Sequence, residues 1–400
     1  MVKICKMQIV KFFFFFVLIL PTIGIINLRN QYIGLPDLSW ISSLLDFFYM
    51  LSISMIFYYV VYKVFKGTLS LGNTTGLILI LYFYIFVRTF VVDYDINRAV
   101  VNVIIMILMI ELSVQTIQDL AAFVGVLNFF GILNLISILL LYPSKGLKFW
   151  SDVTKRYWVD NYFLGYDNGF IILAIPLLCC NLILYGNYKK KRYLACIGVC
   201  ILTEVMIFSA SSVIALGIFL LFCLLGETRY IKKILYNPFT SIIGVYVAFF
   251  ILVICRFLTL VNKIVYFLFQ KTLSGARNRL WEKGLERVGQ RCLFGYGFGK
   301  VELGGGYNAA HQMVLEWLLQ GGIVELIMYT ILLLTVLSAL SKKIKYKNAR
   351  IIYNGIVSVL VAYIAESYST YAYYWVFLSL FVFANKKLII ENNMMSEKAV

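Results

Sequence analysis

The chain has 400 residues, of which 62% are hydrophobic and only 14% are charged. This balance excludes an ordinary soluble domain and indicates a polytopic membrane protein. The formal net charge of +17 is distributed over short clusters between apolar runs, so it does not predict a nucleic-acid partner.

Apolar runs bounded by charged or turn residues predict the membrane-spanning helices, each of which needs about 20 apolar residues to cross the hydrocarbon. Twelve runs qualify, and together they predict an all-α integral membrane domain over residues 1–400. The first run is expected to be a retained helix, because no small-residue cleavage site follows it. The runs are 12–28, 41–62, 74–92, 99–115, 120–142, 169–186, 193–209, 211–226, 239–257, 322–340, 351–367 and 371–385.

Lysine and arginine clusters between the runs predict which ends lie in the cytoplasm. The N-terminal lysines, Lys189 to Arg192 and Lys342 to Arg350 all fall on one side of the membrane if the N-terminus is cytoplasmic. Short basic loops of this kind stay inside under the positive-inside bias. Twelve spans then return the C-terminus to the cytoplasm and leave residues 143–168 and 270–310 outside.

The predicted outer segments carry more positive charge than this bias favours. Basic residues recur from Arg256 to Lys300, whereas the acidic residues of the same region are only Glu282, Glu286 and Glu302. Either long loops simply tolerate this charge, since they cross the membrane regardless of it, or the charge meets an anion. Lipid headgroups and a phosphorylated substrate are the available anions. We favour the substrate and expect the two outer segments to form the active-site face.

The second outer segment shows helical and turn patterns. Basic residues in 256–271 recur at near-helical spacing among apolar ones, which predicts an amphipathic helix at the interface. Another helix is predicted at about 279–290, followed by glycine-rich turns in 295–306. The segment ends at His311, the one histidine of the chain.

The eight cysteines form no CxxC pair and no Cys/His cluster. The sequence also contains no phosphate-binding loop and no dinucleotide fingerprint. We therefore expect no metal site and no cofactor.

Several segments resemble the O-antigen polymerase and ligase superfamily. They are Ser274-Gly-Ala-Arg277 with Trp281, Leu293-Phe-Gly295-Tyr-Gly297-Phe-Gly299, and Ala310-His311-Gln312 before Gly321-Gly322-Ile323, with weaker echoes at Phe163 to Gly169 and Ser209 to Ser212. Two departures stand out. Ser212 replaces an arginine of many members, which removes a presumed phosphate contact and slightly favours a polymerase over a ligase. Gln312 replaces an asparagine that often follows the histidine.

The resemblance implies a multi-pass glycosyltransferase of the bacterial cytoplasmic (inner) membrane, with its active site on the periplasmic or extracellular face. The donor would be a glycan on undecaprenyl diphosphate and the acceptor a lipid-linked repeat unit of an O-antigen or capsular polysaccharide. Fixed cations can stabilise a leaving diphosphate without a metal ion. Membrane lipids, a chain-length regulator and a flippase are the further partners that the resemblance implies.

Two alternatives remain open. A ligase would transfer the glycan to an acceptor other than the repeat unit, and acceptor choice depends on pocket shape. A polysaccharide flippase, which belongs to a different class, also has about a dozen helices. A flippase should show an internal repeat and a central cationic path, but here the basic residues gather in two outer loops.

Four residues are assigned to the reaction itself. Arg277 and Arg279 are expected to bind the diphosphate because a guanidinium contacts phosphate oxygens bidentately, and Arg256 is assigned the same role. His311 is the candidate base for the acceptor hydroxyl. The alternative for His311 is a hydrogen-bonded residue at the membrane boundary.

Four further residues are candidates for contact with the glycan. Glu366 lies at the predicted outer end of a span, where an ionisable residue is costly and usually functional, and is the second candidate acid. Asn168, Tyr371 and Trp281 are expected to contact sugar. An aromatic belt at the membrane surface explains the tyrosines equally well.

Overall fold

The computed structural model describes residues 2–23, 39–94, 96–144, 146–151, 156–226, 228–257, 262–263, 266–267, 275–299, 301–304, 309–369 and 371–391. Helices dominate these residues. The helices of the N-terminal half are α1 (Val2–Ile19), α2 (Ser39–Phe65), α3 (Asn73–Asp93), α4 (Arg98–Ser113), α5 (Ile117–Leu141), α6 (Ile171–Tyr188) and α7 (Lys191–Ile207). Those of the C-terminal half are α8 (Ala210–Leu225), α9 (Arg229–Leu235), α10 (Pro238–Phe249), α12 (Gly275–Gln290), α13 (Met313–Gln320), α14 (Gly322–Ser341), α15 (Lys347–Ala362), α16 (Trp375–Phe383) and α17 (Lys387–Ile390).

Each predicted apolar run overlaps one of these helices. Five helical stretches of the described chain are long and apolar enough to cross a membrane, namely Trp40–Phe65, Asn73–Asp93, Ile117–Leu141, Ile171–Tyr188 and Met313–Ser341. Shorter apolar helices occupy Gln8–Ile19, Ala210–Leu225 and Pro238–Ile254. The helical membrane character is thus confirmed, whereas the number of twelve spans and their orientation stay predictions.

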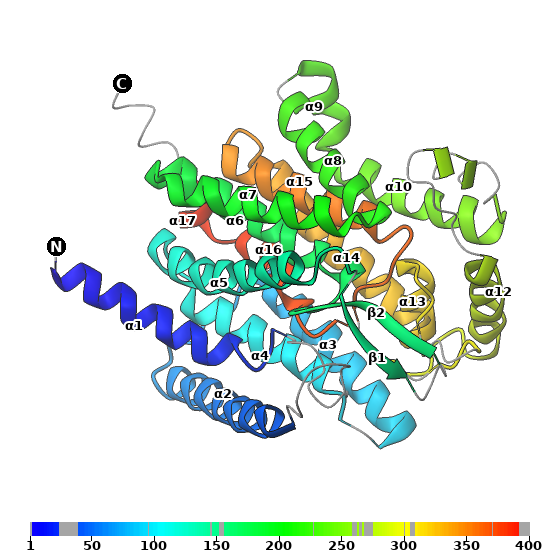
Figure 1. Ribbon diagram of the computed structural model, residues 1–400, viewed down its shortest axis with the longest axis horizontal. Coiled ribbons are helices and arrows are strands. Elements are labelled where there is room, and N and C mark those ends of the chain that lie inside the picture. The colour runs from blue at the N-terminus through cyan, green and yellow to red at the C-terminus, as the bar shows by residue number, and fades with distance from the viewer. Residues whose placement is uncertain are drawn as a thin grey trace.

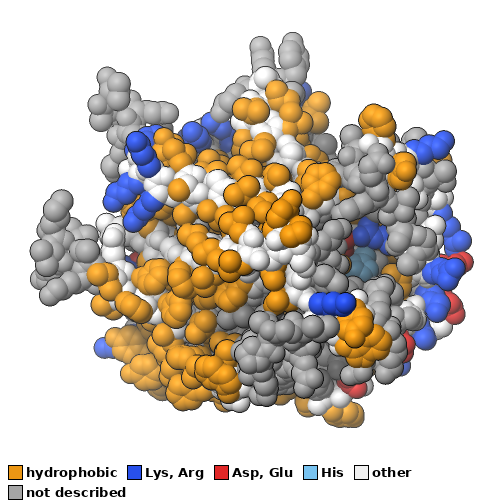
Figure 2. Space-filling view, viewed as in Figure 1, with side chains coloured by type: hydrophobic (Ala, Val, Ile, Leu, Met, Phe, Trp, Pro, Cys, Tyr) orange, Lys and Arg blue, Asp and Glu red, His pale blue; other side chains and the backbone are white. Residues whose placement is uncertain are grey.

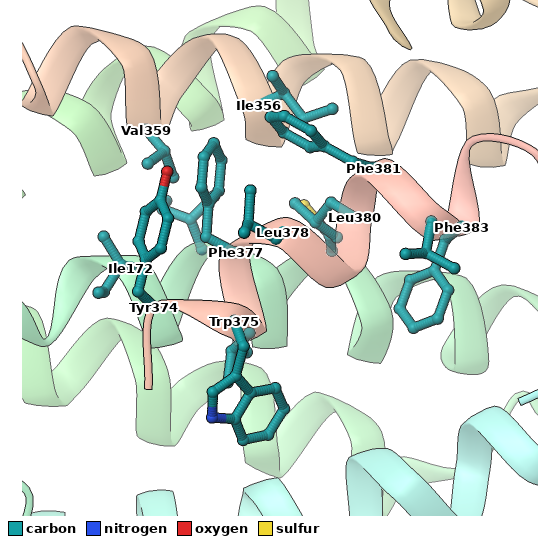
Figure 3. Packing of buried hydrophobic residues seen from close by; sticks show 14 of the residues in the cluster. Ile172, Ile356, Val359, Tyr374, Trp375, Phe377, Leu378, Leu380, Phe381 and Phe383 are labelled. Carbon is teal, nitrogen blue, oxygen red and sulfur yellow. The ribbon is translucent and has the colours of Figure 1, made fainter. Parts of the chain in front are cut away.

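The centre of the bundle is formed by helices that are apolar on every side. All side chains of α16 are buried, and α6 is buried from Ile171 to Asn181. A helix without a polar face is stable only when other helices surround it. Figure 3 shows how α16 fills this space, with Tyr374 and Phe377 on the side of Ile172 and Val359, and Trp375 on the opposite side.

The first outer segment contains strands, so the expectation of an all-α protein is wrong here. Strands β1 (Leu147–Ser151), β2 (Arg156–Tyr162) and β3 (Gly165–Tyr166) form an antiparallel sheet in the order β1-β2-β3. Aromatic residues are frequent in β1 and β2, and such residues favour strands. A short sheet with open edges is compatible with the predicted place of this segment outside the hydrocarbon, because hydrocarbon does not permit unpaired strand edges.

The last two predicted spans are shorter as helices than their apolar runs. The run 351–367 continues beyond the end of α15 at Ala362, and α16 begins only at Trp375. The loop between them contains Ser367 and Ser369, whose hydroxyls compete with helical backbone bonds. Glu366 and Tyr371 therefore lie on a loop.

The two ends of the bundle differ in content. Figure 1 shows α12, α13 and the β1–β2 hairpin at one end and α1 and α17 towards the other. Near α17, Lys386 Nζ lies 3.2 Å from Glu111 Oε1, and Thr75 Oγ1 donates to Glu111 Oε2 at 2.6 Å. Glu111 thus pairs between helices, away from the outer segments.

The orientation can be tested with single cysteines in a background without the native ones. Glu302 is an exposed residue of the predicted outer segment 270–310. Lys190 is an exposed residue of the turn between α6 and α7. We expect Glu302→Cys to react with an impermeant maleimide in intact cells and Lys190→Cys to react only after the membrane is opened. The reverse labelling pattern would contradict the predicted orientation.

Candidate functional site

The site is built around the turn that carries His311. His311 has a φ of 51°, a left-handed conformation that is uncommon outside glycine and is often found at functional sites. The following residue, Gln312, caps α13 because its Oε1 accepts from Leu315 N at 2.8 Å. Thus α13 starts two residues after the histidine, and its capped N-terminus orients the turn.

Two further contacts hold the residue before the histidine. Ala310 N donates to Glu316 Oε2 at 2.7 Å, and Trp281 Nε1 donates to the Ala310 carbonyl at 2.9 Å. Glu316 belongs to α13 and Trp281 to α12, and both are buried. The strained turn is therefore fixed from both helices.

The same helix also holds the loop that carries Glu366. Met313 N donates to the Tyr363 carbonyl at 3.2 Å, and Gln320 Nε2 donates to Ser369 Oγ at 3.4 Å. These bonds lie on either side of Glu366 in the sequence. Consequently α13 positions His311 and Glu366 relative to each other.

Glu366 joins the two strongest candidates of the sequence. Arg277 Nη2 donates to Glu366 Oε1 at 2.6 Å, and His311 Nδ1 lies 2.9 Å from Glu366 Oε2. The three residues come from α12, from the turn before α13 and from the loop before α16. Sequence reasoning named all three but did not predict that they touch.

The exposure of the three side chains increases away from the carboxylate. The side chain of Glu366 is 6% exposed, that of Arg277 18% and that of His311 30%. Burial raises the pKa of Glu366, but the hydrogen bond from His311 and the charge of Arg277 outweigh it and hold that pKa below its usual range. Glu366 is therefore an anion at neutral pH.

An ionised carboxylate has no proton to donate, so Nδ1 of His311 must be the donor in this bond. In the neutral imidazole the lone pair then resides on Nε2. A carboxylate that orients an imidazole in this way, and stabilises its protonated form, is the arrangement of a general base. Figure 2 shows a histidine side chain recessed in a hollow beside Lys or Arg side chains.

Tyr371, one of the predicted glycan-contacting residues, lies against the glycine that follows another of them, Asn168. A methyl group on Gly169 would overlap the ring of Tyr371, so the ring lies directly on this glycine, one residue after Asn168. Burial, and next the charge of Glu366, raise the pKa of the Tyr371 hydroxyl well above its usual range. The first outer segment and the last loop thus meet beside Glu366.

The remaining candidates lie elsewhere. Arg279 is exposed, and two residues along an α-helix correspond to a rotation of about 200°, so it points away from the side of Arg277. Arg256 pairs with Glu282 at 3.2 Å on the exposed surface of α12. Trp281 is 3% exposed, which leaves no ring face for sugar, and its observed role is to support the histidine turn.

The predicted amphipathic helix over 256–271 falls mostly outside the described residues. Helix α12 begins four residues earlier than predicted and packs Leu280 and Trp281 into a second apolar cluster. Within the described chain, no group of three or more His, Cys, Asp or Glu side chains is arranged to hold a metal ion.

The glycine motif after α12 packs the outer segment onto the bundle. Gly295 has a φ of +61°, and the amides of Tyr296 and Gly297 each donate at 2.8 Å, to the carbonyls of Leu319 and Gln320. Arg88 of α3 reaches the same turn, with Nε 2.8 Å from the Phe294 carbonyl and Nη2 2.6 Å from that of Gly295. This glycine turn therefore docks on α13.

Two supporting residues had only weak signals in the sequence. Glu316 is an acidic residue in the first turn of a helix, a typical position for a partner of backbone amides. Arg88 is an ionisable residue near the end of an apolar run, which marks it as costly but does not reveal its partner.

These features define a helical membrane protein with an arginine, a carboxylate and a histidine assembled at one end of the bundle. Residues 194–330 match the family described as O-antigen ligase. The matched segment includes Arg277 and His311 and ends before Glu366. The match confirms the resemblance to the O-antigen polymerase and ligase superfamily and supports a membrane enzyme that transfers glycans. A search of curated proteins found no match.

The docking role of the glycine motif can be tested with a matched pair of alanine variants. Gly295 and Gly299 have φ values of +61° and +65°, but a Cβ on Gly295 would lie 2.5 Å from the Gln320 carbonyl oxygen, whereas one on Gly299 would meet no atom within 4 Å. We expect Gly299→Ala to lower the free energy of unfolding by about 1–2 kcal/mol through backbone strain alone. Gly295→Ala should lower it further.

Thermal unfolding of the detergent-purified protein, followed by tryptophan fluorescence, measures this difference. Equal midpoints for the two variants would show that the turn is not held against α13.

Proposed function

We propose that this protein is a polysaccharide repeat-unit polymerase. It transfers a growing glycan from undecaprenyl diphosphate to a sugar hydroxyl of a lipid-linked acceptor repeat unit. The observation that carries the proposal is the Glu366 carboxylate between Arg277 and His311. One base and one phosphate-binding cation are the minimum that this reaction requires.

The base acts on the acceptor. His311 Nε2 takes the proton of the acceptor hydroxyl as its oxygen attacks the anomeric carbon of the donor. Glu366 keeps Nδ1 protonated and stabilises the imidazolium that forms. Because the reaction is a single displacement, the configuration at the anomeric carbon inverts.

The cation acts on the leaving group. The bond between the anomeric carbon and the diphosphate oxygen breaks as the new bond forms, and the electron pair stays on the diphosphate. Arg277 is aimed at the same carboxylate as His311, so it lies beside the reacting atoms and can stabilise this developing charge. No metal ion is needed for this step.

A lipid carrier also needs an apolar path near the site. A groove of about 410 Å³ is lined mostly by apolar residues of α8, α9, α10 and α15 and by Ile364, and it also includes Thr240 and Ser241. Ile364 lies two residues before Glu366. The groove therefore supports a substrate whose diphosphate is at the site and whose chain lies along the helices.

Ser212 slightly favours a polymerase over a ligase. It stands where many members of the superfamily have an arginine, and its side chain is fully buried in α8. The phosphate contact of that arginine is therefore absent at this position. A ligase is the second candidate, because the matched family is described by that activity.

Four variants test the assignment of roles. We expect His311→Ala to lower kcat by about 10²–10⁴-fold, as is typical for loss of a general base. Glu366→Gln should also lower kcat, because an amide can donate to Nδ1 and so favours the wrong tautomer. Arg277→Ala should raise the donor KM in addition. Arg287→Ala, an exposed position on the same helix, should match the wild type.

The assay supplies membranes with lipid-diphosphate repeat units, alone or with a non-repeating acceptor, and measures product length. Ladders of repeats on the carrier identify a polymerase, and single transfer to the added acceptor identifies a ligase. If His311→Ala membranes build long polymer at near-normal rates, the histidine is structural and the base lies elsewhere.

A further inference from the structure

Arg277, the cation proposed to bind the donor diphosphate, is already paired with Glu366. Arg277 Nη2 is bonded to Glu366 Oε1 at 2.6 Å, while Glu366 Oε2 faces His311. Because the second oxygen is engaged by the histidine, Arg277 does not have the two-pronged partner that a guanidinium binds best. A phosphate group offers that geometry and carries more negative charge.

The positions of the side chains allow Arg277 to change partners while Glu366 stays. The carboxylate is 6% exposed and is held on a loop that α13 fixes at Tyr363 and Ser369. Arg277 is 18% exposed and extends from α12, a helix of the outer segment. A long, partly exposed side chain can turn towards a ligand, whereas the buried carboxylate has no such freedom.

We propose that donor binding moves Arg277 from the Glu366 carboxylate to the diphosphate and thereby makes His311 a stronger base. This inference rests on the proposed function and adds a coupling between the two substrates to it. In the unliganded site Arg277 neutralises part of the charge of Glu366. Once the arginine has turned to the diphosphate, the full negative charge of Glu366 stabilises the imidazolium of His311.

The consequence is an order of events. The base reaches full strength only when a diphosphate occupies the site, so an acceptor hydroxyl is activated only next to a donor. Glu366 acts in this scheme as a positioning residue, because it works through His311 and Arg277 and touches no reacting atom.

Other charged and titratable groups also face this site. Glu316 of α13 lies close enough to His311 for the two charges to interact. Burial, and next the charge of Glu366, raise the pKa of Tyr368 and of Tyr371, so both hydroxyls stay neutral in the range where an imidazole titrates. Glu316 is bonded to Ala310 and Gln320, and neither bond depends on the donor.

The coupling can be measured without turnover because the chain has a single histidine. The protein, purified through a tag without histidine and labelled with ¹⁵N-histidine in nanodiscs, gives one imidazole to titrate by NMR. Farnesyl diphosphate, which carries no glycan to transfer, serves as the diphosphate probe, and its binding is measured separately by calorimetry.

We expect the probe to raise the pH midpoint of the imidazole titration by about one unit or more in the wild type. In Glu366→Gln the probe should raise the midpoint by clearly less, because only the negative charge of the probe itself then acts on His311. Arg277→Gln should already have a raised midpoint without the probe, while the control Arg287→Gln should behave like the wild type. The comparison of Arg277→Gln with Arg287→Gln does not depend on whether Glu366→Gln folds.

The possible results separate the coupling from the function. If the probe binds and the midpoint shifts equally in the wild type and in Glu366→Gln, or Arg277→Gln leaves the midpoint unchanged, the exchange of partners is wrong and the transferase stands. If calorimetry shows that the wild type does not bind the probe, the diphosphate-dependent function and the exchange both fail.

Discussion

One buried negative charge organises the end of the bundle that carries α12 and α13. The Glu366 carboxylate is 6% exposed, and removing one partner from a buried ion pair typically costs about 3–5 kcal/mol. Its two partners, Arg277 on α12 and His311 before α13, both lie far from Glu366 in the sequence. Satisfying this single charge therefore ties the long outer segment to the loop between α15 and α16.

The rest of the outer end supports that arrangement. The short helix α13 holds the histidine turn through Gln312 and Glu316, and holds the Glu366 loop through Tyr363 and Ser369. The glycine turn after α12 docks on the carboxyl end of α13. Helix α13 packs against α12 and α14, so the groups that it positions are held by more than one element.

The site was partly predictable from residues alone. His311 and Arg277 stand in a recognisable motif, and Glu366 is a costly charge at the end of an apolar run. Their contact was not predictable, because Glu366 lies 55 residues beyond His311 and the pairing depends on where α15 ends. Arg279 and Trp281 belong to the same motif as Arg277, yet helical rotation places one on the exposed side and the other in the apolar cluster. The sheet in the first outer segment was missed because hydropathy does not distinguish strands from short helices outside the lipid.

Composition and apolar periodicity by themselves determined that the chain is a helical membrane protein, because hydrocarbon permits few backbone structures and each needs a long apolar run. The same pattern identified the polar segments and the one histidine, since these stand out against an apolar background. Only the tertiary structure decided which arginine contacts Glu366, and which nitrogen of His311 faces that carboxylate. These are matters of distance and direction, and they arise from how α12, α13 and the Glu366 loop pack together.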